Sequence, residues 1–191
     1  MLGQPPPVIA EPLPYVAKLE SRTPADIDLV VIHCTELPDL ATAREYGERV
    51  LYASGSGNSG HYYIDRDGSV HQYVPDDRVA HHVRGHNARA IGIELVNTGR
   101  YPDWLASTRQ QMQEPYPEAQ ITALVGLLNA LQARHPSLRY IAGHEDLDTT
   151  RVNASDDDRI EVQRKLDPGP LFPWADVMRE VSFQRLPSGP G

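Results

Sequence analysis

Residues 27–33, which read IDLVVIH, decide the fold because they predict a buried strand that ends in a histidine. The run is rich in β-branched side chains, which favour the strand conformation. Alternation along a strand places His33 on the same face as Leu29. Residues 91–96, which read IGIELV, predict another buried strand, and Glu94 interrupts its apolar run. Each predicted core strand therefore carries one side chain, His33 or Glu94, that can bind a metal or transfer a proton.

The rest of the chain alternates between helical and strand patterns. Residues 118–134 carry the strongest helical pattern, with an apolar stripe formed by Ile121, Leu124, Val125, Leu128 and Leu131. The other expected elements are helices over 42–52 and 174–181, a hairpin of 61–64 and 70–74, and a strand over 139–142. Together they predict an α/β fold, a single domain with a mixed central β-sheet flanked by helices.

The length of 191 residues predicts one domain with a single core. Pro-rich residues 1–25 are expected to form an arm laid over the domain, residues 26–182 the domain itself, and residues 183–191 a C-terminal tail. The first residues show no basic segment followed by an apolar one, so no signal peptide is expected and the protein is predicted to be cytoplasmic. The alternative is a periplasmic or secreted protein whose leader is missing from this sequence. The single cysteine, Cys34, excludes an internal disulfide.

The net charge argues against two classes of partner. A formal charge of −8 disfavours nucleic acid and anionic membrane surfaces, because both require a basic face. No apolar run approaches the length that spans a bilayer, so no membrane insertion is expected. We expect a monomer.

Four residues in the predicted elements and loops can bind a metal or transfer a proton. They are His33, Glu94, His144 and Asp167. Two imidazoles, a carboxylate and a separate glutamate are the components of a hydrolytic zinc site. A single histidine at the end of a strand is more often structural. The four residues together are therefore stronger evidence for a metal site than any one of them alone.

Glu94 is the most informative member of the set. A carboxylate inside a buried strand is costly unless it is paired or functional. One alternative is a buried ion pair with Arg89 or Arg66. The other is a general base, since apolar surroundings raise the pKa of a carboxyl group toward neutrality.

Asp167 lies in the run KLDPGP at residues 165–170. A residue before proline adopts extended geometry, in which residues two apart share a face. Lys165 and Asp167 are therefore expected to project into one site, the alternative being a surface salt bridge or a solvated turn.

Histidines gather between residues 61 and 86 without the spacing of a compact zinc motif. We interpret His81 as a residue that faces the substrate or supports the site. The run of three aspartates at residues 156–158 lacks the ligand spacing of an EF-hand and is expected to be a solvated charge run.

Five motifs follow one another along the chain: VIHCT at 31–35, GHYYIDRDG at 60–68, Asn87 with IGIEL at 91–95, GHED at 143–146, and KLDPGP at 165–170. In this order they resemble the type 2 N-acetylmuramoyl-L-alanine amidases, the AmpD-like zinc amidases related to phage T7 lysozyme and peptidoglycan recognition proteins. The resemblance covers roughly residues 27–178.

The resemblance implies one Zn²⁺ per chain, bound in a surface groove. It implies hydrolysis of the amide between the lactyl group of N-acetylmuramic acid and L-alanine, in peptidoglycan or its muropeptide fragments. It assigns His33, His144 and Asp167 as zinc ligands, with Glu94 and Lys165 as catalytic residues. The residues expected to contact the substrate are His61, His81, Asn87 and Arg151.

Two departures favour the AmpD-like branch. The lysozyme and recognition-protein branches often have a functional tyrosine where this chain has Gly60, and a cysteine ligand where it has Asp167. One alternative is a non-catalytic peptidoglycan-binding module of the same fold. A zinc peptidase is the other, but no His-Glu-x-x-His helix supports it.

Overall fold

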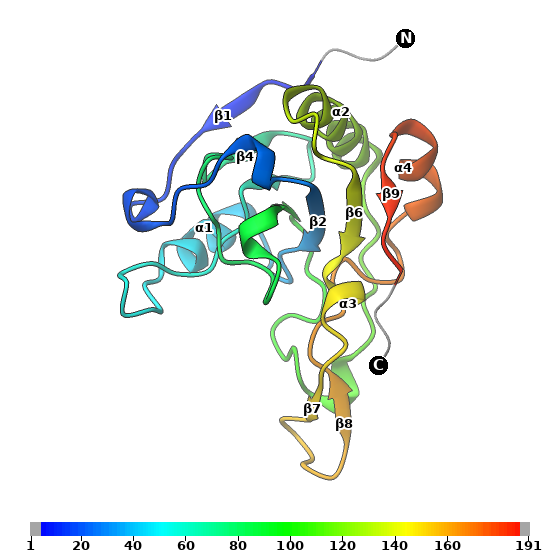
Figure 1. Ribbon diagram of the computed structural model, residues 1–191. Coiled ribbons are helices and arrows are strands. Elements are labelled where there is room, and N and C mark those ends of the chain that lie inside the picture. Colours follow the sequence, from blue (N-terminus) through cyan, green and yellow to red (C-terminus); the bar gives the residue numbers. More distant parts are fainter. Residues whose placement is uncertain (1–4, 188–191) are drawn as a thin grey trace.

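The computed structural model describes residues 5–187, and seven of its strands form one sheet (Figure 1). Among the described strands of this sheet, only β3 (Tyr62–Ile64) and β4 (Val70–Gln72) pair antiparallel, whereas the other neighbours run parallel. The mixed sheet expected from the sequence is therefore confirmed. In spatial order the strands are β1 (Val8–Ala10), β4 (Val70–Gln72), β3 (Tyr62–Ile64), β5 (Ala90–Leu95), β2 (Leu29–Cys34), β6 (Tyr140–Gly143) and β9 (Gln184–Arg185).

Helices cover both faces of this sheet. The helices α2 (Glu118–Arg134) and α4 (Trp174–Glu180) pack on one face, where Leu124, Leu128 and Val177 join the main apolar core. Helix α1 (Leu40–Glu48) lies with a second cluster that includes Tyr63 and Tyr73. The remaining helices are α3 (His144–Leu147) and four 3₁₀ turns, Val16–Lys18, Pro24–Asp26, Asn87–Arg89 and Ser107–Arg109.

The expected helix over 118–134 has the bounds of α2, whereas the expected helix over 42–52 lies over Leu40–Glu48 instead. The reason for the earlier start is a cap, because the Asp39 side chain accepts a hydrogen bond from the Thr42 backbone N–H. Among the described residues, no helix is both long and apolar enough to cross a membrane.

Both chain ends contribute to the sheet. In the expected arm, β1 pairs with β4, and Leu13, Tyr15 and Leu19 are buried in the second apolar cluster. At the other end β9 pairs with β6, and Phe183 joins the main core. The described parts of the expected arm and tail are thus structural parts of the domain, while residues 1–4 and 188–191 lie outside the described range.

The polar segment 145–164 contains a hairpin that the sequence did not predict. Strands β7 (Arg151–Asn153) and β8 (Glu161–Gln163) pair with each other and not with the main sheet. Figure 1 shows this hairpin extending away from the sheet. Its strands are three residues long and mostly polar, so they lack the apolar alternation from which a strand is predicted.

The strand register brings the chemical side chains to one edge of the sheet. In the parallel pair of β2 and β5, His33 stands opposite Glu94. In the parallel pair of β2 and β6, Ile32 stands opposite Gly143, so His144 follows at the level of His33. The carboxyl ends of parallel strands are the edge at which α/β proteins place their ligands.

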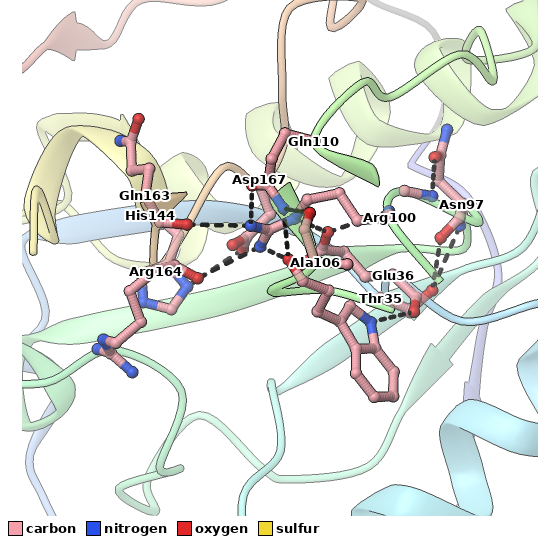
Figure 2. A network of polar contacts seen from close by, with 12 residues as sticks. Thr35, Glu36, Asn97, Arg100, Ala106, Gln110, His144, Gln163, Arg164 and Asp167 are labelled. Carbon is pink, nitrogen blue, oxygen red and sulfur yellow. Dashed lines mark hydrogen bonds and ion pairs between the residues drawn. The ribbon is translucent and has the colours of Figure 1, made fainter. Parts of the chain in front are cut away.

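A buried ion pair fastens the loop with Asp167 to the end of β2 (Figure 2). Arg100 binds both carboxylate oxygens of Glu36, through Nε at 2.7 Å and Nη2 at 2.9 Å. Its guanidinium also donates to the backbone carbonyls of Gln163 at 3.0 Å and Arg164 at 3.3 Å. One side chain therefore ties three segments together directly behind the site.

Replacing Arg100 with alanine would leave the Glu36 carboxylate buried, with side-chain exposure of 9%, and without its cation. We expect Arg100→Ala to lower the free energy of unfolding by about 3–5 kcal/mol, measured by urea unfolding followed by circular dichroism. The control is Arg159→Ala, which removes an ion pair with Asp157 whose arginine is 84% exposed and should change stability little. Equal stability of Arg100→Ala and the wild type would contradict this account.

Candidate metal centre

Three side chains from distant parts of the chain meet at the carboxyl edge of the sheet. His33 comes from β2, His144 begins α3, and Asp167 lies in the loop after β8. All three are buried, and their possible ligand atoms lie within 4.8 Å of one another. Asp167 Oδ2 is 2.8 Å from His33 Nδ1 and 3.1 Å from His144 Nδ1. The structure thus brings together the three residues expected to bind the metal.

The charges at this centre favour a metal ion. Burial lowers the pKa of His33 to about 4, so its imidazole is neutral at pH 7. Burial alone would raise the pKa of Asp167, but the imidazoles of His144 and His33 hold it well below its usual range. The second oxygen, Asp167 Oδ1, has no hydrogen-bond partner among the described residues. Two imidazoles beside a buried carboxylate with an unused oxygen are a donor set that fits a divalent cation.

Glu94 faces the same centre without an arginine partner. Its Oε1 is 4.0 Å from His33 Nδ1, and its side chain is 14% exposed. Arg89 binds Asp28 and Arg66 binds Glu114, so the alternative of an ion pair between Glu94 and either arginine is wrong.

Burial, and next the charge of Asp167, raise the pKa of Glu94 well above its ordinary value, and Lys165 opposes them. The two carboxyl groups of the site therefore differ sharply in proton affinity. Such a difference allows one to stay an anion while the other exchanges a proton.

Gly60 lies close to Glu94 and leaves room for its side chain. A Cβ atom at position 60 would lie 2.8 Å from Glu94 Cγ. A tyrosine there would displace Glu94, so a glycine at this position leaves the glutamate its room.

A groove of about 820 Å³ opens over these residues. His33, Glu94, His144, Lys165 and Asp167 all line it. Lys165 is thus on the same face as Asp167, as the extended geometry predicts. The groove provides a polar floor and room for a ligand of more than one residue.

The four expected substrate contacts separate into two groups. His81 and Asn87 line the groove. The expectation that His61 contacts the substrate is wrong, because its side chain is fully buried. Its Nδ1 accepts a hydrogen bond from the Gly92 N–H at 3.1 Å, and its Nε2 donates one to the Arg78 carbonyl at 2.9 Å. The expectation for Arg151 is also wrong. This residue lies on the exposed hairpin, where it binds the carbonyl of Glu161, and it does not line the groove.

Sequence reasoning missed three residues at the site. Tyr52 and Arg164 line the groove. His82 lines it as well, and its Nδ1 is 2.9 Å from His33 Nε2. The available signal was Gly92, because a glycine inside a strand often marks the close approach of another group. A Cβ atom at position 92 would lie 2.7 Å from the His82 ring.

Comparison with known proteins agrees with this geometry. Residues 23–170 match the family model described as N-acetylmuramoyl-L-alanine amidase. The chain is 36% identical over 126 residues to 1,6-anhydro-N-acetylmuramyl-L-alanine amidase AmpD of Citrobacter freundii, covering 61% of this chain and 54% of that protein. It is 34% identical over 120 residues to N-acetylmuramoyl-L-alanine amidase AmiD of Escherichia coli, covering 58% of this chain and 37% of AmiD. The chain thus spans about half the length, or less, of these curated relatives.

Solved structures share the fold. The amidase LysC from Clostridium intestinale superposes with a TM-score of 0.66 at 20% identity, covering 94% of this chain and 99% of LysC. Escherichia coli AmiD, in complex with anhydro-N-acetylmuramic acid-L-Ala-D-γ-Glu-L-Lys, superposes with a TM-score of 0.61 at 26% identity, covering 81% of this chain and 57% of AmiD. Family model, relatives and fold agree, and this chain belongs to the N-acetylmuramoyl-L-alanine amidase family.

Proposed function

We propose that this protein is a zinc-dependent amidase that cleaves the bond between the lactyl group of N-acetylmuramic acid and L-alanine, in peptidoglycan or its muropeptide fragments. One observation carries the proposal. The Glu94 carboxyl group, which has no arginine partner among the described residues, lines the same groove as the cluster of His33, His144 and Asp167. The names of the relatives AmpD and AmiD, and the muropeptide bound to AmiD, support this substrate class.

His33, His144 and Asp167 would hold the zinc ion, one per chain. Zinc held by three protein ligands supplies Lewis acidity, which polarises a carbonyl group and lowers the pKa of water. The two neutral donors and one anion leave a net positive charge on the occupied site, which favours attack on an amide.

Glu94 would move the proton. It accepts the proton of the attacking water as the new C–O bond forms on the lactyl carbonyl carbon. It then delivers that proton to the L-alanine nitrogen as the C–N bond breaks. A pKa raised by burial suits both steps, because the group must gain and lose a proton near neutral pH.

Lys165 would stabilise the negative charge that develops on the carbonyl oxygen. The Lys165 charge lowers the pKa of both His33 and Glu94, and Lys165 lines the groove with them, which supports this role. A fixed cation in a partly water-excluded groove stabilises an oxyanion more than it would in bulk water.

The digestion of defined muropeptides tests the proposed bond. We expect products with a free N-terminal L-alanine and a lactyl carboxylate, identified by mass spectrometry, and no product when a chelator is present. Restoration by added zinc serves as the control for chelator side effects. Cleavage inside the stem peptide would indicate a peptidase instead, and binding without cleavage would indicate the non-catalytic module.

Replacing Glu94 with glutamine keeps the shape of the side chain but removes the proton acceptor. We expect Glu94→Gln to lower kcat at least about 100-fold, with the zinc content of the purified protein unchanged. The matched control is Glu145→Gln, because Glu145 also has a pKa raised by burial, to about 7, yet does not line the groove. Full activity of Glu94→Gln, or equal losses in both variants, would overturn the assignment.

A further inference from the structure

We infer that His82 is a positioning residue for the metal centre: it accepts a hydrogen bond from His33 and thereby fixes which nitrogen of His33 faces the metal. The inference rests on the proposed zinc site and adds a residue outside its ligand set. The contact joins His33 Nε2 and His82 Nδ1 at 2.9 Å. The two rings meet edge to face, with centroids 5.0 Å apart and an interplanar angle of 85°.

The contact determines the tautomer of His33. Nδ1 of His33 faces Asp167 Oδ2 and can bind a metal only through a free lone pair. The ring proton must then lie on Nε2, which donates it to His82 Nδ1. Metal-binding histidines are generally oriented through the other ring nitrogen in this way, although the usual acceptor is a carboxylate, a carbonyl or water.

The other histidine of the centre lacks such a partner. His144 Nε2 is buried and has no hydrogen-bond partner among the described residues. Orientation by a side chain through the remote nitrogen is therefore seen for His33 and not for His144.

The surrounding fold fixes the position of His82. The Asn87 side-chain oxygen accepts the backbone N–H groups of His82 at 3.0 Å and Val83 at 2.8 Å. On the other side, Gly92 of β5 leaves room for the ring, since a Cβ there would lie 2.7 Å from His82 Nδ1. This arrangement gives Asn87 a structural task, to hold the turn that presents His82.

His82 is not itself a metal ligand in this geometry. Its Nδ1 is occupied by His33, and it is not part of the cluster of His33, His144 and Asp167. Its Nε2 is shielded from water. The ring therefore acts through His33.

Two substitutions at one position separate the hydrogen bond from simple packing. In His82→Asn, the side-chain oxygen can accept a hydrogen bond near the position of Nδ1, whereas His82→Leu fills the space without an acceptor. We expect His82→Leu to weaken zinc binding about 10- to 100-fold, measured by competition with a chelator of known affinity. His82→Asn should restore most of this loss. The control is His86→Leu, which changes a histidine of the same segment that does not line the groove and should leave zinc affinity unchanged.

A second readout excludes a purely structural role. The visible spectrum of the Co²⁺-substituted protein should change in His82→Leu and resemble the wild type in His82→Asn. The unfolding temperatures of the metal-free variants should not rank in the same order as their zinc affinities. Wild-type zinc affinity in His82→Leu, or equal losses in both variants, would overturn the inference. If the wild type cleaves muropeptides with tightly bound zinc and His82→Leu binds it equally well, only the inference fails. A wild type that binds no zinc would overturn the proposed function as well.

Discussion

A carboxylate withdrawn from water between two imidazoles is the constraint on which the site depends. Asp167 is 3% exposed, one of its oxygens lies within 3.1 Å of both His33 and His144, and the other has no partner among the described residues. An anion in such surroundings is costly unless a cation compensates it. His33 is neutral at pH 7, so its imidazole does not supply that charge. A divalent ion held by the three side chains would supply it.

The fold supplies what this arrangement requires. Parallel pairing of β2 with β5 and β6 brings His33, Glu94 and His144 to one edge, and the ion pair of Arg100 and Glu36 holds the loop with Asp167 against that edge. The site then contains two carboxyl groups whose pKa values move in opposite directions. Asp167 remains an anion that can bind metal, and its charge helps to raise the proton affinity of Glu94. The charge of Asp167 thus links the proposed metal ligand to the proton affinity of Glu94.

Local patterns in the sequence predicted the elements with long or purely apolar runs, such as α2, β2 and β5, because burial leaves a periodic signal. The motifs also pointed to His33, Glu94, His144, Lys165 and Asp167. Short strands such as β1, β7 and β9 carry no such signal, since their pairing depends on partners far along the chain. The same limit explains His61 and His82, because the groups that bind their rings lie elsewhere in the chain. Gly92 and Arg78 bind the ring of His61, whereas His33 binds the ring of His82.

X-ray absorption at the zinc edge of the purified protein tests the metal centre most directly. The account predicts one zinc per chain, with two imidazole nitrogens at about 2.0–2.1 Å and oxygen donors at about 2.0–2.2 Å. In Asp167→Ala the zinc should be lost or bound with a changed ligand shell. A sulfur donor, a third imidazole in the wild type, or an unchanged ligand shell in Asp167→Ala would contradict the assignment of His33, His144 and Asp167 as the ligands.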